Sequence, residues 1–207
     1  MKEKNTPLTN EEVLSRLAVY TFVQKFYSAS LNKLEKSIWN TLISSLEKDT
    51  KGLKEEKVKQ GIQLLSQLKD EDLKELEYDF NRLFVGPNKL EASPYESSYL
   101  NADNALMQRE TMSVREFYKL VGLEVANRNV DPDDRLALEL EFICYLLETS
   151  FDNQDCIVLY QQFLRKHLFK WIISHTELVR KKTSNTIILG ISSILEGIIL
   201  EEKRILE

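Results

Sequence analysis

The fold is indicated most clearly by residues 70–87, which read DEDLKELEYDFNRLFVGP. Apolar side chains recur there at intervals of three and four residues: Leu73, Leu76, Phe80, Leu83 and Phe84. This spacing predicts an α-helix with one apolar face. Asp70 is a suitable N-cap, and Gly86-Pro87 is typical of a helix end, because glycine adopts the left-handed C′ conformation and proline cannot continue the helix.

The same signals divide the rest of the chain into helices. Thr9 and Glu12 form a capping box ahead of a helix that reaches Tyr27, and Asn32 is the predicted cap of a second helix. Ser93-Pro94-Tyr95-Glu96 and Asp131-Pro132 each combine a capping residue with a proline, which predicts a helix start at both places. The remaining periodic segments are residues 54–69, 105–121, 154–167, 168–182 and 185–206.

The composition agrees with an all-helical protein. The 207 residues include only 6 Gly and 4 Pro, whereas an all-β or βαβ fold of this size needs many tight turns. No internal repeat and no polar linker divides the chain. We therefore predict an all-α fold, a single-domain helical bundle of about nine helices over residues 1–207.

Charge and hydropathy restrict the partners of the protein. The formal net charge is -5, and no basic stripe is present, which argues against binding to nucleic acid or to an anionic membrane surface. The most apolar stretch, residues 187–200, is too short to span a bilayer and contains Glu196. The first residues lack the apolar core of a signal peptide, and two cysteines do not make a secreted-type framework. We expect a cytoplasmic protein.

No residue pattern predicts catalysis. His167, His175, Cys144 and Cys156 lack the short spacing of a zinc site, so structural roles are favoured over a thiol–imidazole or metal site. Asp133-Asp134 is a pair of carboxylates, but acidic residues are common at helix starts because they interact favourably with the helix dipole. No glycine-rich phosphate loop occurs. We therefore predict no enzyme, no metal and no cofactor.

Two blocks of sequence carry a more specific signal. The first is FNRLFVGP at residues 80–87, followed by Leu90, Ala92, Pro94, Tyr95-Glu96-Ser97 and Tyr99-Leu100. The second is DPDDRLALELEF at residues 131–142. In content, order and spacing, these blocks resemble the signature motifs of the TorD/DmsD family of molybdoenzyme chaperones.

The resemblance implies an all-helical cytoplasmic chaperone without catalytic turnover. Members of that family bind the precursor of a molybdopterin-dependent oxidoreductase through its twin-arginine signal peptide or its apoenzyme body. They hold back export until the cofactor is inserted. The implied partner is therefore such a precursor, and the oligomeric state stays open between a monomer and a homodimer.

Binding a twin-arginine signal calls for an apolar groove and for carboxylates that pair with guanidinium groups. The candidate peptide-binding residues lie in the two blocks: Phe80, Leu83, Phe84, Pro87, Pro94, Tyr95, Glu96, Tyr99, Asp134 and Arg135. Each has a structural explanation too, since the phenylalanines suit a core and Glu96 suits a capping box. We expect the site chiefly at Tyr95, Asp134 and the loop of residues 87–94.

Two positions depart from the family pattern. Tyr95 stands where tryptophan is usual, and it keeps a flat apolar face. Arg135 stands where histidine is usual, and its permanent charge would oppose a twin-arginine pair or neutralise Asp134. An assembly factor for a non-exported molybdoenzyme subunit, similar to NarJ, is therefore an alternative. A metal- or nucleotide-dependent hydrolase that uses Asp133 and Asp134 is an alternative of a different class.

Overall fold

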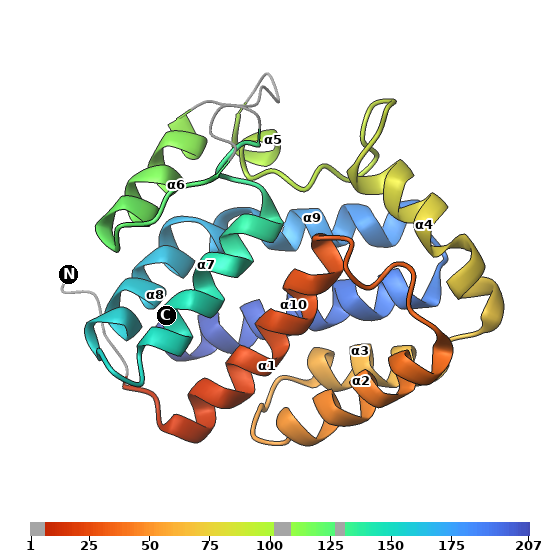
Figure 1. Ribbon diagram of the computed structural model, residues 1–207, viewed down its shortest axis with the longest axis horizontal. Helices are drawn as coiled ribbons and strands as arrows, with labels where there is room; N and C mark the ends of the chain where they lie inside the picture. Colours follow the sequence, from red (N-terminus) through yellow and green to blue (C-terminus); the bar gives the residue numbers. More distant parts are fainter. Residues whose placement is uncertain (1–6, 102–108, 127–130) are drawn as a thin grey trace.

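The computed structural model describes residues 7–101, 109–126 and 131–207. Over these ranges the chain forms ten helices and no strand, which confirms the predicted all-α class (Figure 1). Their bounds are α1 (Asn10–Tyr27), α2 (Lys36–Asp49), α3 (Glu56–Ser66), α4 (Asp70–Phe84), α5 (Ser97–Leu100), α6 (Arg109–Leu120), α7 (Leu136–Thr149), α8 (Asp155–Lys166), α9 (Leu168–Lys182) and α10 (Thr186–Leu206).

The C-terminal helix α10 forms the centre of the bundle. It contacts α1, α3, α4 and α9, and Figure 1 shows it passing behind α1. Buried residues occur on every side of it between Ile187 and Leu206. A helix of this composition is stable when other helices surround it. None of the described helices combines the length and the apolarity needed to cross a membrane.

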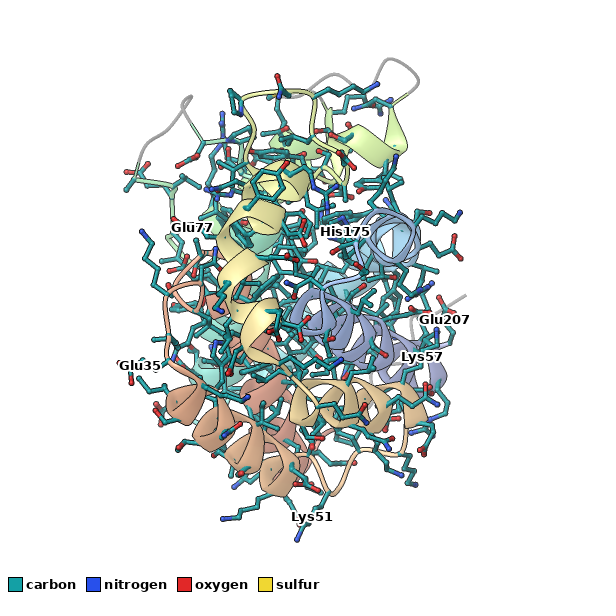
Figure 2. The ribbon with its side chains drawn as sticks, turned by 90° about the vertical axis from the view of Figure 1, so that its right-hand side faces the viewer. Glu35, Lys51, Lys57, Glu77, His175 and Glu207 are labelled. Carbon is teal, nitrogen blue, oxygen red and sulfur yellow. The ribbon has the colours of Figure 1, made fainter. Side chains whose placement is uncertain are left out.

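Glycines allow α3 and α10 to approach each other closely. A Cβ atom on Gly61 would lie 2.6 Å from the carbonyl oxygen of Gly190, and one on Gly197 would lie 2.6 Å from the backbone nitrogen of Val58. Beside this crossing, Lys57 of α3, which is labelled in Figure 2, forms an ion pair with Glu196 of α10. The absence of side chains at these glycines thus sets the separation of two core helices.

Several predicted helix ends are confirmed. The N–H of Glu12 donates to the Thr9 hydroxyl at 3.3 Å, and the N–H of Thr9 donates to the Glu12 carboxylate at 2.9 Å, so the capping box is present. Helix α4, which was predicted within residues 70–87, ends at Phe84, and Gly86 lies two residues later with a φ of 105°. Helix α9 has the predicted bounds, and α10 starts after the cap Asn185.

Other predicted helix starts are wrong by a few residues. Asn32 does not cap a helix, because residues 28–33 form turns and α2 begins only after Glu35. Lys69 occupies the cap position of α4, so Asp70 is the first helical residue. The segment predicted over 54–69 is helical over the shorter range of α3. Residues 105–108 of the helix predicted over 105–121 lie outside the described ranges.

The two segments that combine a capping residue with a proline do not begin a helix at the residue that the capping rule predicts. Helix α5 begins at Ser97 and α7 begins at Leu136, three or more residues after each proline. The cause is a long-range pairing of the two segments. The N–H of Leu136 donates to the carbonyl of Pro94 at 2.8 Å, and the N–H of Glu96 donates to the carbonyl of Asp134 at 3.1 Å. These bonds pair the two segments, and the N–H of Arg135 donates to the carbonyl of Pro132 at 3.1 Å in a turn, so no helix starts at either proline. A rule based on local sequence does not include such long-range bonds.

Candidate peptide-binding site

A pocket lies beside the loop that connects α4 to α5. Its volume is about 600 Å³. It is lined by Lys89, Leu90, Glu91, Ser93, Tyr95, Ser98, Tyr99, Leu178 and Lys182. Two tyrosine rings and two leucines among a few polar groups are typical of a ligand pocket. We call it the loop pocket, and in Figure 1 the loop stands at the top of the molecule between α4 and α5.

The two sequence blocks meet at the edge of the loop pocket. Tyr95 and Arg135 form an isolated antiparallel β-bridge, the contact through which the segments before α5 and α7 pair. Tyr95 is half-buried, and burial is the main cause that raises the pKa of its hydroxyl. The bridge therefore fixes the backbone of Tyr95 while part of its ring remains open to a ligand.

Asp134 joins three segments behind this bridge. Its side chain is fully buried, and one carboxylate oxygen accepts from the N–H of Ser97 at 2.9 Å. The other oxygen accepts from the hydroxyl of Thr111 at 2.7 Å. Asp134 thus caps the start of α5 and connects it to α6. Because its side chain is inaccessible, it stabilises the backbone behind the loop pocket and does not line the pocket.

Glu96 is also buried, beside His167. The Glu96 carboxylate oxygen and the His167 Nδ1 atom are 2.7 Å apart. Burial raises the pKa of Glu96, and the contact with His167 opposes that rise. Nearby, burial and then the charges of Glu96 and Asp134 raise the pKa of Glu139 well above its usual value. Glu96 therefore does not complete the predicted capping box.

A second buried histidine holds the wall of the loop pocket. His175 Nδ1 lies 3.1 Å from the carbonyl of Ser93 and 2.9 Å from the hydroxyl of Tyr99, and Nε2 lies 2.8 Å from the hydroxyl of Tyr27. Because a carbonyl only accepts, we assign the proton to Nδ1, so that Nε2 accepts from Tyr27. Burial lowers the pKa of His175 to about 3. We call these four residues the His175 cluster, and Figure 2 labels His175 itself.

The structure divides the predicted binding residues into buried and accessible groups. Three belong to the core of the bundle: Phe80, Leu83 and Phe84. The rings of Phe80 and Phe84 pack edge to face with Phe26, as the structural explanation of the sequence anticipated. Pro94 is buried in the extended segment. The accessible members are Pro87 on the exposed loop and the half-buried Tyr95, Tyr99 and Arg135.

Arg135 does not pair with Asp134. Its guanidinium lies 3.7 Å from the Asp131 carboxylate, and the two side chains are 30% and 41% exposed. An ion pair this long and this exposed contributes little to stability. A positive charge therefore stands next to Tyr95 with only weak compensation.

The carboxylates proposed for a hydrolase have other partners. Asp133 is buried and accepts from the Arg115 guanidinium at 2.7 Å and 3.2 Å. No group of three or more His, Cys, Asp or Glu side chains in the described part of the chain could hold a metal ion. Cys144 contacts Thr21 and neither histidine. Both aspartates thus serve the packing of the loops before α5 and α7.

Some residues of this region could not be selected from the sequence. Leu178 and Lys182 come from α9, far from either block, and lie in the loop pocket because α9 passes beneath the loop. His175 is one of only two histidines in the sequence, and it lies on the buried face of α9 among apolar residues. This position was the only feature of the sequence that distinguished it. Its partners come from α1, α5 and the loop, and only the folded structure brings them together.

Comparison with known proteins supports the resemblance seen in the sequence. The sequence model of the nitrate reductase delta subunit family matches residues 45–176. The chaperone protein TorD of Vibrio cholerae is 30% identical over 146 residues, which are 66% of this chain and 64% of TorD. The Tat proofreading chaperone DmsD of Salmonella typhi is 27% identical over 92 residues, or 44% of this chain and 43% of DmsD. The chain thus spans less than two thirds of the length of these relatives.

A solved structure described as a redox enzyme maturation protein from Archaeoglobus fulgidus aligns with 92% of this chain and 96% of its own, with a TM-score of 0.49 and 15% identity. The family match covers more than half of the chain and includes both sequence blocks. The protein therefore belongs to the nitrate reductase delta subunit family, together with the TorD and DmsD chaperones that its two blocks resemble.

Proposed function

We propose that this protein is a cytoplasmic chaperone that binds the precursor of a molybdopterin-dependent oxidoreductase and assists its maturation, without catalytic turnover of its own. Membership of the family and the similarity to TorD and DmsD support the class of client. The observation that carries the proposal is the loop pocket, an open concavity with two tyrosines and two leucines in its lining, beside the place where the two family blocks meet.

The mechanism is reversible burial of an apolar segment of the precursor. The rings of Tyr95 and Tyr99 and the side chain of Leu178 offer an apolar surface. The hydroxyl group of Tyr95, which also lines the pocket, can form a hydrogen bond to a peptide backbone. The His175 cluster and Asp134 hold this surface in place from behind. Occupation of the pocket by a signal segment would delay export while folding and cofactor loading proceed.

Tyr95 is expected to contribute a large part of the affinity for the precursor segment. Replacing it with alanine removes an accessible ring from the pocket, and we expect the dissociation constant for the N-terminal peptide of a client to rise about tenfold. Fluorescence anisotropy of a labelled peptide measures the change. Tyr78→Ala is the matched control, because Tyr78 is 71% exposed on α4 and lines none of the pockets described here.

Equal affinities for the wild type, Tyr95→Ala and Tyr78→Ala would contradict the assignment of the loop pocket. Absence of binding at micromolar concentration, for both the peptide and the full-length precursor, would contradict the proposed function itself.

A second candidate function is the assembly of a molybdoenzyme subunit that is not exported. The partly exposed Arg135 beside Tyr95 favours it, because a fixed positive charge repels a twin-arginine pair. The mature part of such a subunit would then supply the apolar segment, and the loop pocket would keep the same role.

Replacing Arg135 with histidine distinguishes the two candidates. At pH 8 a histidine is mostly neutral, so Arg135→His should bind a twin-arginine peptide about tenfold more tightly at low salt. Arg204→His is the control, since Arg204 is an exposed α10 residue paired with Glu201 and lines none of the pockets. An unchanged affinity would mean that Arg135 does not exclude twin-arginine peptides.

A further inference from the structure

A groove lies between α1 and α2, and none of its lining residues also lines the loop pocket. Its volume is about 620 Å³. We call it the α1–α2 groove. Figure 1 shows α2 and the start of α1 at the bottom of the molecule, and the loop between α4 and α5 at the top. The groove is therefore a surface that the loop pocket does not explain.

The floor of the α1–α2 groove is apolar. Phe22, Leu31 and Leu46 line it and are buried, and the half-buried Leu42 lies among them. Leu14 also lines the groove, yet 55% of it is exposed. An exposed leucine that continues an apolar floor is typical of an interaction surface, because a partner would remove both from water.

One face of α1 borders this groove along most of the helix. Its members follow one another at intervals of three and four residues: Glu11, Leu14, Ala18, Thr21 and Lys25. All five are exposed or half-buried. This spacing is typical of a seam along which two helices pack, and the small side chain of Ala18 at its centre permits a close approach. We call these five residues the α1 seam.

Opposite charges occupy the two ends of the α1 seam. Glu11 lies in the first turn of α1 and Lys25 in the last, about 21 Å apart along the helix. Neither forms an ion pair with another residue of the described ranges. Ala18 stands midway between them. A second α1 that runs antiparallel, with its own Ala18 opposite this one, would therefore place a lysine beside Glu11 and a glutamate beside Lys25.

The charges of the whole groove favour such a self-complementary partner. The lining contains three acids and three lysines, so the groove attracts neither a strongly basic nor a strongly acidic segment. Charges at the ends of α1 also suit the helix dipole. The helix dipole does not explain the exposure of Leu14, which lies on the same face.

We propose that the α1–α2 groove binds a second copy of this chain in a two-fold symmetric dimer, with the two α1 helices antiparallel and their Ala18 residues facing each other. Each Glu11 then pairs with Lys25 of the other copy. Each Leu14 enters the groove of the other copy, over Phe22. A two-fold contact uses the same surface on both subunits, which is the symmetry that the α1 seam shows.

The dimer keeps both loop pockets available, because the two concavities share no lining residue. This inference goes beyond the proposed function and does not depend on it. The contact is centred on one pair of helices, so we expect a weak dimer with a dissociation constant in the micromolar range or above.

Charge reversal tests the register of the two helices. Glu11→Lys alone and Lys25→Glu alone each place like charges opposite each other at both ends of the contact. Each variant should dimerise at least about tenfold more weakly than the wild type in sedimentation equilibrium. The controls Glu75→Lys and Lys74→Glu make the same changes of net charge at exposed positions of α4, and they should dimerise as the wild type does.

Mixing the two seam variants should restore the dimer. A Glu11→Lys chain carries two lysines on its seam and a Lys25→Glu chain carries two glutamates, so both ion pairs form again between unlike chains. We expect a heterodimer with about the affinity of the wild-type dimer, whereas an equimolar mixture of the two α4 controls should show no preference for unlike chains.

Leu14→Ala tests the apolar part of the contact separately. It should weaken the dimer about tenfold without changing any charge. Thermal unfolding of dilute samples verifies that each variant keeps its fold, and Leu14 contributes little to that fold because most of it is exposed.

Three results would overturn the assignment. If the wild type stays monomeric up to nearly millimolar concentration, the α1–α2 groove does not bind a second copy. If the wild type dimerises and neither the seam variants nor Leu14→Ala weaken the dimer, the subunits meet through another surface. If the two seam variants form no heterodimer when mixed, the antiparallel register centred on Ala18 is wrong.

Discussion

Acid should destabilise the wild-type protein much more than its His175→Gln variant. In the folded state the pKa of His175 is about 3, because the ring is fully buried. In the unfolded chain a histidine has its usual pKa of about 6.5. Between these values the unfolded state binds a proton that the folded state does not. The stability due to neutral His175 is therefore present above pH 6.5 and is lost as the pH falls toward 3, by up to about 1.4 kcal/mol per pH unit.

Urea unfolding at pH 7, 6, 5 and 4 measures this difference. Glutamine cannot titrate, yet it can donate to the Ser93 carbonyl and accept from the Tyr27 hydroxyl, which are the bonds that His175 makes. From pH 6.5 to 4 the wild type should lose about 3 kcal/mol more than the variant. Other acidic and basic groups titrate in both proteins and cancel in the comparison. Parallel stability curves would show that His175 is protonated in the fold without cost.

Adding one methyl group to Gly61 should destabilise the protein by about 3 kcal/mol. The new Cβ atom of Gly61→Ala would lie 2.6 Å from the carbonyl oxygen of Gly190 and 2.8 Å from the backbone nitrogen of Ile194. Neither backbone group can rotate away, so α3 must move from α10. Alanine favours a helix over glycine by about 1 kcal/mol, which offsets only part of this cost.

Gly52→Ala is the matched control for this substitution. Gly52 lies in the turn before α3, and a Cβ atom there would meet nothing closer than the Ser15 hydroxyl at 3.8 Å. Its free energy of unfolding should stay within about 0.5 kcal/mol of the wild type. Urea unfolding compares the two variants. Equal stability of Gly61→Ala and Gly52→Ala would mean that the α3–α10 contact is looser than described.

The helices were predictable where local signals and burial agree. Thr9 and Glu12 form the expected capping box, and the bounds predicted for α9 from its apolar periodicity agree with the structure. The predictions were wrong where distant segments pair. Pro94 and Asp134 offer their carbonyls to Leu136 and Glu96, so neither segment starts a helix at its proline. Such pairing depends on residues about forty positions apart, which a capping rule cannot take into account.

The sequence predicted part of the lining of the loop pocket, and its role as a binding site stays a prediction. The loop after Gly86 and the tyrosines Tyr95 and Tyr99 do line one pocket. Asp134 was expected to pair with a guanidinium group of the peptide. In the structure its carboxylate is buried and accepts hydrogen bonds from Ser97 and Thr111 instead. Whether a side chain faces a ligand or supports the fold depends on its tertiary partners. Residue type and spacing do not determine those partners.

The concavity between the end of α6 and α7, with a volume of about 420 Å³, illustrates the same limit. Glu124 lies after α6 and outside both sequence blocks, whereas Glu141 lies in the second block, seventeen positions further along the chain. They share a rim because the segment after α6 lies against α7, near Tyr118 and Phe142, whose rings are 4.8 Å apart. A sequence pattern records neither this contact nor the apolar floor between them.

The central claim is that this protein binds an apolar segment of a molybdoenzyme precursor in the loop pocket. Isothermal titration of a full-length precursor without its cofactor into the purified protein, beside Tyr95→Ala and Tyr78→Ala, tests it most directly. We predict a dissociation constant in the micromolar range or below for the wild type and Tyr78→Ala, and clearly weaker binding for Tyr95→Ala. No measurable binding to the wild type, or equal binding by all three proteins, would contradict the account.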